Sequence, residues 1–228
     1  MSTSYNLENI IKRAKTINEN PLILFDQFIE ISLDNIDDIK PGTYRLKKIP
    51  TIKQIKEFPF YKGSNSEIGL ICYHGVWIIH IASEGAREVQ FPIDIKALAY
   101  MGDLDFFLHS HPPLQGDIHY WLPSINDLDF SKSTHSLTQF ISTDRGLVKL
   151  KVVNRDISYA EKFRKYAFDE VHGNYDTFKL LYNNLMHRFC SLYQNYSITN
   201  WSELNPEDTI DTLMETLTVN SIKNEEIR

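Results

Sequence analysis

Cysteine is scarce in this sequence, and its scarcity excludes one common kind of metal site. The 228 residues include two cysteines, Cys72 and Cys190, and no CxxC pair. A zinc site built on thiolates is therefore not expected. Because one disulfide at most could form, free thiols in a reducing compartment are the simpler interpretation.

A targeting or membrane-spanning segment is not expected either. Residues 1–20 alternate between polar and apolar positions and contain no apolar core of a signal peptide. The longest apolar run near them, residues 22–25, is far too short to cross a bilayer. We therefore expect a cytoplasmic protein without a membrane partner.

No stripe of basic residues stands out. The chain has 24 Lys and Arg against 30 Asp and Glu, which gives a net charge of -6 and a pI of about 5.7. Without a basic surface, binding to nucleic-acid phosphates is not expected. With 42% hydrophobic and 24% charged residues, the composition is that of an ordinary globular protein, long enough for one domain with a helical appendage.

The hydrophobic pattern predicts an α/β core over residues 1–155. Alternating apolar stretches predict strand pairs at 68–73 with 76–82 and at 137–142 with 147–153. Further strands are expected at 22–31, 43–46, 87–91 and 105–109, and helices at 5–19, at 51–57, after Pro92 and at 124–130.

Residues 156–228 have a different pattern. Three segments, 157–171, 175–194 and 206–219, carry apolar residues at helical spacing. Many of these residues are aromatic, and aromatics at helical spacing usually belong to a packed face. We therefore expect a helical C-terminal region that packs on the core or on a second subunit.

The motif His109-Ser110-His111 ends an apolar strand. Residues i and i+2 of a strand project to the same face of a sheet, so the two imidazoles can converge on one point. Pro112 follows and terminates the strand. Zinc favours such ligands, and a catalytic zinc needs three protein ligands and one open position.

Asp127 is the best candidate for the third ligand. It lies in the segment Pro123-Ser124-Ile125-Asn126-Asp127, where a helix is expected to begin. Two histidines and an aspartate leave one position for water, whose pKa a bound zinc lowers to roughly 7. A carboxylate must then accept the proton and pass it to a leaving amine.

Together, His109-Ser110-His111-Pro112 and Ser124-x-x-Asp127 resemble the signature of the JAB/JAMM (MPN+) metalloprotease family. An upstream Glu on a strand before Gly-Leu completes that signature, and here it reads Glu67-Ile68-Gly69-Leu70. The strands around Asp144-Arg145-Gly146 also fit the pair that follows the motif in the family. The resemblance covers residues 50–153 and implies a JAB/MPN-like mixed β-sheet flanked by helices.

The resemblance also implies roles for particular side chains. It assigns a zinc ion to His109, His111 and Asp127, the general base to Glu67, and help in stabilising the tetrahedral oxyanion to Ser124. Members of the family cleave amide bonds, and many release ubiquitin or ubiquitin-like tails from lysine. The implied function is that of a zinc metallopeptidase or isopeptidase with a protein or peptide substrate, ubiquitin-like proteins among them.

One departure from the family is the loop between the two parts of the signature. Residues 112–123 separate His111 from Ser124, where the family usually has a shorter connection. Insertions in a loop cost little. This loop could line the substrate groove or cover it, and the residues in it that could contact substrate are Asp117, His119, Tyr120 and Trp121.

Each part of the motif also has an ordinary structural explanation. A lone HxH can pack in a core, and Ser124 with an acid three residues later is close to a helix capping box. Asp105 precedes His109 closely but matches no motif, and Cys72 has no histidine at a recognised spacing, which disfavours a cysteine protease. The metal site is favoured because the residue types, their order and their expected structural contexts agree.

Two other functions are compatible with the same residues. A non-catalytic subunit on the same fold would bind or scaffold other proteins, as relatives without the ligands do. A toxin-like effector peptidase would use the same site on another protein. Metal content distinguishes the scaffold from either enzyme, because a scaffold needs no ion.

Overall fold

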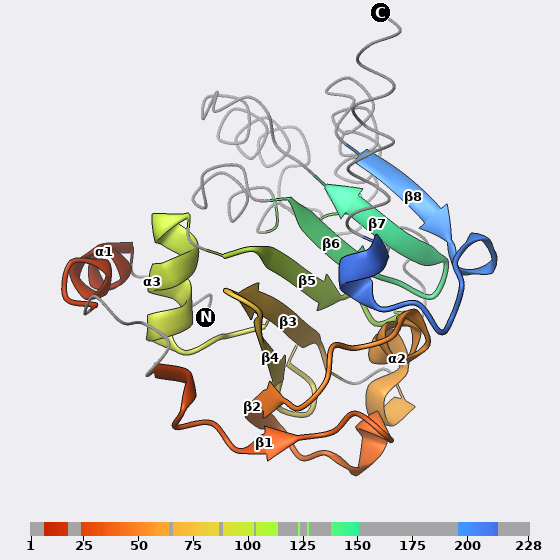
Figure 1. Cartoon of the computed structure of the whole chain (residues 1–228), viewed down its shortest axis with the longest axis horizontal. Coiled ribbons are helices and arrows are strands. Elements are labelled where there is room, and N and C mark those ends of the chain that lie inside the picture. The colour runs from red at the N-terminus through yellow and green to blue at the C-terminus, as the bar shows by residue number, and fades with distance from the viewer. Residues whose placement is uncertain are drawn as a thin grey trace, which may run out of the picture.

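The computed structural model describes residues 7–17, 24–63, 66–86, 89–102, 104–113, 123, 127, 138–150 and 196–213. Within these ranges, one mixed sheet has the strand order β1-β2-β4-β3-β5-β6-β7-β8, with helices packed beside it (Figure 1). The strands are β1 (Glu30–Ile31), β2 (Gly42–Leu46), β3 (Ile68–Tyr73), β4 (Val76–Ile81), β5 (Phe106–Ser110), β6 (Gln139–Ser142), β7 (Gly146–Leu150) and β8 (Tyr196–Asn200). The helices are α1 (Leu7–Ala14), α2 (Ile52–Glu57) and α3 (Ile93–Met101), and the 3-10 turns are η2 (Ile36–Asp38), η3 (Phe58–Gly63) and η4 (Trp201–Glu203).

The predicted hairpin of residues 68–73 and 76–82 is confirmed as β3 and β4. Tyr73 pairs with Val76 across the turn, so only His74 and Gly75 connect the strands. Both turn residues have positive φ, 47° and 79°, as the tight turns that match the twist of a hairpin require. Glycine tolerates this backbone without strain, and this local signal made the hairpin predictable.

The sheet separates two apolar clusters because neighbouring residues of a strand point to opposite faces. On β3, Leu70 and Cys72 join the cluster that contains Ile52 and Ile55 of α2. The alternate residue Ile71 joins the cluster that contains α3. The predicted α/β architecture is thus confirmed within the described residues, with α2 and α3 on opposite faces.

The helices predicted at 51–57 and after Pro92 are confirmed as α2 and α3. Thr51 and Gln54 form a capping box at the start of α2, which satisfies two backbone N–H groups that the first turn leaves free. Pro92 precedes α3, and Gly102 ends it with a φ of 82°. None of the described helices has the length and apolar character needed to cross a membrane.

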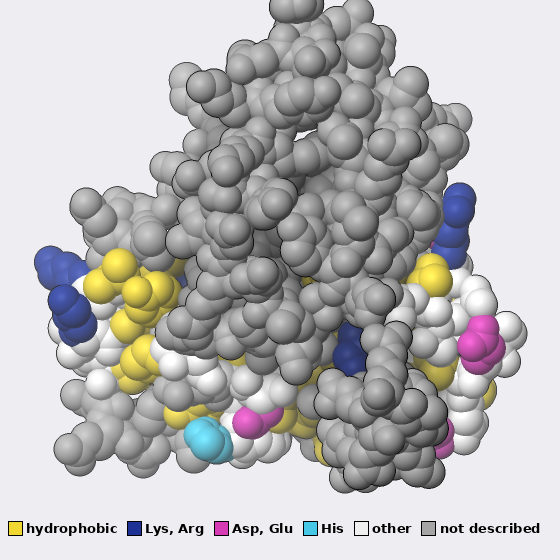
Figure 2. Space-filling view, turned by 90° about the horizontal axis from the view of Figure 1, so that it is seen from above, with side chains coloured by type: hydrophobic (Ala, Val, Ile, Leu, Met, Phe, Trp, Pro, Cys, Tyr) yellow, Lys and Arg dark blue, Asp and Glu magenta, His cyan; other side chains and the backbone are white. Residues whose placement is uncertain are grey.

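Helix α1 lies beside α3 (Figure 1). Its residue Ile10 is buried, whereas Lys12 is exposed, and α1 packs against α3. The Arg13 guanidinium also donates a hydrogen bond to Asp94 of α3. In Figure 2, hydrophobic and basic side chains accordingly gather on the side that α1 and α3 occupy in Figure 1.

Two of the expected strands differ in the structure. Of the described residues 24–31, only Glu30–Ile31 forms a strand, because Phe25 turns inward and packs in the cluster under α3. Residues 89–91 are not a strand either. The side chains of Val89 and Phe91 lie over Gly69, where an added Cβ would come within 2.4 Å of Val89 and 2.6 Å of Phe91. Burial of these apolar side chains outweighs their strand propensity.

Strand β8 lies in the region that was expected to be helical. It pairs antiparallel with β7, with Gly146 opposite Asn200 and Leu150 opposite Tyr196. A Cβ on Gly146 would lie 2.3 Å from the Thr199 carbonyl oxygen, so glycine permits the two backbones to approach. The segments 157–171 and 175–194 lie outside the described residues, while residues 210–213 are helical as expected.

Candidate metal centre

Two histidines lie at the carboxyl end of the central strand β5. His109 is opposite Gly69 of β3 and beside Ile141 of β6, so its side chain shares the face that carries α3. The backbone N–H of His111 donates to the Ser142 carbonyl at 2.9 Å, which continues the pairing with β6 beyond the strand end. Both imidazoles are buried, with residue exposures of 4% and 8%. The backbone therefore holds them in place, as the His109-Ser110-His111 motif predicts.

Asp127 completes a compact group of three donor atoms with these histidines. The two Nε2 atoms are 3.0 Å apart. The Asp127 carboxylate places Oδ1 3.0 Å from His109 Nε2 and Oδ2 3.4 Å from His111 Nε2. Within the part of the chain that the structure describes, this is the one group of this kind that could hold a metal ion.

The distances fit a tetrahedral ion. Zinc bonds of about 2.0–2.1 Å at tetrahedral angles put neighbouring ligand atoms about 3.3–3.4 Å apart, close to the 3.0–3.4 Å observed. Protons alone do not explain the group. With Asp127 ionised, both imidazoles would have to donate to it, and their N–H groups would oppose each other at 3.0 Å. A cation would accept a lone pair from all three atoms.

The charge state of Asp127 favours a cation. Burial opposes the charged carboxylate, but attraction to His109 and hydrogen bonds from both histidines outweigh it, so the pKa of Asp127 lies well below its ordinary value. The carboxylate is therefore ionised at neutral pH and available as a ligand. A carboxylate next to two imidazoles is a donor set that suits zinc.

Glu67 immediately precedes β3. The pairing of β3 with β5 ends at Gly69 and His109, and the Ile68 N–H then donates to the Ser110 hydroxyl at 2.9 Å. Continued by two residues, this register would bring Glu67 opposite His111, and directly opposite residues share a face at Cβ distances of about 4.5–5.5 Å. Glu67 is half-buried and is not among the three residues of the metal group.

The second half of the motif is described only in part. Ser124 lies outside the described residues, and so do the loop residues Asp117, His119, Tyr120 and Trp121. Asp127 is described and has helical geometry. The structure thus brings together His109, His111 and Asp127, while Glu67 lies just before the neighbouring strand β3.

Gln139 is a neighbour of the site that the sequence analysis did not identify. It is the first residue of β6 and is fully buried. Its Nε2 donates to the backbone carbonyl of Asp127 at 2.5 Å. A long polar side chain at the start of a buried strand was the one signal in the sequence, because a buried amide needs hydrogen-bond partners.

His80 lies in the same row of the sheet as His109 but does not join the metal group. Gly69 separates them, since it is opposite His80 on one side and His109 on the other. His80 Nδ1 is instead 2.8 Å from the Thr43 hydroxyl. Burial, with a smaller effect of Lys96, lowers the pKa of His80, so this imidazole is neutral at neutral pH.

Cys72 is expected to be unreactive in the folded protein. Burial, mainly, raises the pKa of its thiol to about 11 from the usual 9.0, which alone reduces the thiolate fraction at pH 8 by about 100-fold. In a Cys190→Ser background, the folded protein should therefore be alkylated at Cys72 at least about 100-fold more slowly than the protein unfolded in denaturant. A mass-spectrometric time course would measure both rates. Equal rates in both states would contradict this description of Cys72.

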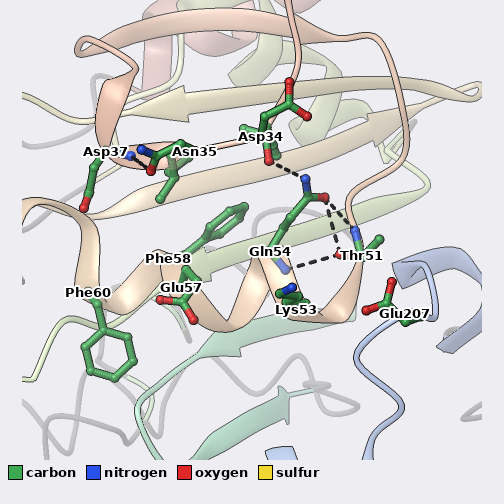
Figure 3. Close-up of a pocket in the computed structure, with 12 residues that line it drawn as sticks. Asp34, Asn35, Asp37, Thr51, Lys53, Gln54, Glu57, Phe58, Phe60 and Glu207 are labelled. Carbon is green, nitrogen blue, oxygen red and sulfur yellow. Dashed lines mark hydrogen bonds between the residues drawn. The ribbon is translucent and has the colours of Figure 1, made fainter.

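A separate polar pocket of about 440 Å³ lies beside α2 and η2 (Figure 3). Its charged lining comprises Asp34, Asp37, Glu57, Glu207 and Lys53. Several of its polar groups cap backbone: Asp37 accepts from the Lys62 N–H at 2.8 Å, and the Thr51–Gln54 capping box forms another wall. Because α2 packs on the face opposite His109, this pocket is not part of the metal centre.

Comparison with known proteins finds no counterpart. No protein-family model, no curated protein and no solved structure matches the chain. The function must therefore be inferred from the geometry and chemistry of the candidate metal centre itself.

Proposed function

We propose that this protein is a zinc-dependent hydrolase of the JAB/JAMM type that cleaves a peptide or isopeptide bond. The observation that carries the proposal is the buried group of His109, His111 and Asp127, whose ligand atoms lie 3.0–3.4 Å apart. A mixed sheet with helices on opposite faces is compatible with the JAB/MPN-like fold that the motif implies.

The number of ligands supports a catalytic centre over a structural one. Structural zinc sites are usually closed by four protein ligands, whereas catalytic sites keep one position open. Within the described residues the group has three members. A bound zinc would act as a Lewis acid and lower the pKa of a water in the open position to about 7.

Glu67 is the residue we assign to proton transfer. Its backbone is held on both sides, because its N–H donates to the Ala86 carbonyl at 3.3 Å and its carbonyl accepts from the Ala82 N–H at 3.0 Å. From the start of β3, next to the strand that carries the histidines, the carboxylate would accept a proton from the water and pass it to the leaving amine. We assign to Ser124 the hydrogen bond that stabilises the oxyanion of the substrate.

The substrate we propose is a protein or peptide, with ubiquitin-like tags on lysine as the first class to examine. Hydrolysis of such an amide needs both an activated water and a proton for the amine. The metal group and Glu67 would supply these two requirements. A nucleophilic cysteine is not needed, and the raised pKa of Cys72 makes that thiol a poor nucleophile.

Chelation should abolish the activity reversibly. Protein purified without a His tag and supplied with zinc is expected to cleave at least one member of a panel of isopeptide-linked substrates, with fluorescence reporting release. A chelator should reduce the rate to background, and added zinc should restore it, because the apoprotein lacks the activated water. Activity that persists in apoprotein would contradict a metal-dependent mechanism. A zinc-loaded protein without turnover on the whole panel would favour the binding or scaffolding subunit.

A further inference from the structure

We propose that Gln139 is a positioning residue that holds Asp127 in place as the third metal ligand. The inference rests on the proposed zinc function and adds a residue that the motif does not contain. Its physical basis is the hydrogen bond from Gln139 Nε2 to the backbone carbonyl of Asp127, 2.5 Å long.

Asp127 needs such an anchor because it comes from a different part of the chain than the histidines. His109 and His111 are fixed by strand pairing with β3 and β6. Asp127 follows His111 only after residues 112–126. Metal ligands must be held within about 0.5 Å of the productive geometry. A hydrogen bond to the backbone of Asp127 fixes the point from which its carboxylate reaches the ion.

Gln139 is itself held firmly. It begins β6, between β5 and β7, with Phe107 and Leu150 as its neighbours across the sheet. Its exposure is 0%, so moving the amide would place polar atoms among apolar neighbours. Its side chain shares a face with that of His109, because Phe107 and His109 are two residues apart on one strand. One face of the sheet thus carries the ligand His109 and also Gln139, which supports the ligand Asp127.

The chemistry of the contact requires a donor at this position. The Asp127 carbonyl oxygen can only accept, and the amide NH₂ of Gln139 supplies the proton. Methionine has a similar length and no donor. Threonine suits a strand but is too short to reach. Both variants should leave the histidines in place and remove this hydrogen bond to the backbone of Asp127.

The test separates zinc affinity from the stability of the fold. We expect Gln139→Met and Gln139→Thr to bind zinc about 10–100-fold more weakly than wild type, the usual cost of losing a partner that orients a ligand. Competition with a chromophoric chelator would measure the affinity. Absorption of the cobalt-substituted protein would report whether the tetrahedral ligand set is kept. Urea unfolding in a chelator would give the stability of each apoprotein.

Tyr61→Phe is the matched control. Tyr61 is also buried, and its hydroxyl donates to the Ile39 carbonyl at 2.8 Å, beside the apolar cluster on the α2 face. Its loss should lower the stability of the apoprotein and leave zinc affinity unchanged. The proposal is supported if only the Gln139 variants lose affinity.

Three outcomes would overturn the proposal. Wild-type affinity in both Gln139 variants would remove the positioning role and leave the metal centre intact. An equal loss of affinity in Tyr61→Phe would reduce the effect to general stability. Wild-type protein without affinity for zinc would refute the metal centre itself, and the inference with it.

Discussion

Asp127→Ala is expected to contain no zinc after a purification in which the wild type retains one ion per chain. The substitution removes one of three ligands and the only formal negative charge of the group, leaving two imidazoles that were held around the ion. Loss of an orienting partner alone costs about 10–100-fold in affinity, so loss of a ligand should cost more than about 100-fold. Elemental analysis of protein prepared without a His tag would measure the metal content.

Asp105→Ala is the control for this experiment. Asp105 is another aspartate close to the histidines in the sequence, but its carboxylate accepts a hydrogen bond from the His74 N–H at 2.5 Å in the hairpin turn. Its removal should leave the zinc content unchanged. Stoichiometric zinc in Asp127→Ala would show that the ligand set is wrong, and loss of zinc from Asp105→Ala would make Asp105 a competing candidate.

Glu67→Gln should keep its zinc and lose its turnover. The amide has nearly the same shape but cannot accept a proton, and general base catalysis typically contributes about 10²–10⁴-fold. We therefore expect kcat to fall by that factor while metal content and the unfolding midpoint stay close to wild type. The rate should be measured on the best substrate of the isopeptide panel, with zinc content determined on the same sample.

Glu84→Gln provides the comparison for Glu67. Glu84 is an exposed acid in the turn after β4. It lies two residues before Ala86, whose carbonyl accepts a hydrogen bond from the Glu67 N–H. The same chemical change there should not alter the rate. Full activity in Glu67→Gln would remove Glu67 from the mechanism, and loss of zinc from that variant would make Glu67 a ligand instead of a base.

Features with a local cause were predictable from the sequence. The hairpin followed from His74-Gly75, α3 from Pro92 and its periodic apolar residues, and the converging imidazoles from the two-residue repeat of a strand. The motif gave the position of Asp127 in the chain, after the histidines. The 3.0 Å distance between its carboxylate and His109 Nε2 depends on how the chain folds.

Features that depend on distant contacts escaped prediction. Strand β8 forms against β7, and its partner Gly146 precedes it by about fifty residues. Val89 and Phe91 are drawn over Gly69 instead of extending into a strand. Gln139 carries no motif, and its importance depends on a carbonyl group twelve residues earlier in the chain. In each case tertiary packing decides among conformations that the local sequence leaves open.

The pairing of β8 with β7 bears on where this chain can be cut. A fragment ending at residue 155 would keep all the metal ligands but would lose β8 from the end of the sheet. It would also lose Ile210 and Leu213, which are buried in the cluster with α2. The fragment would then present the unpaired backbone of β7 and an apolar surface to solvent, two features that promote self-association. Expression of this fragment as an independent unit would therefore favour aggregates, and shortening from the C-terminus should stop beyond residue 213.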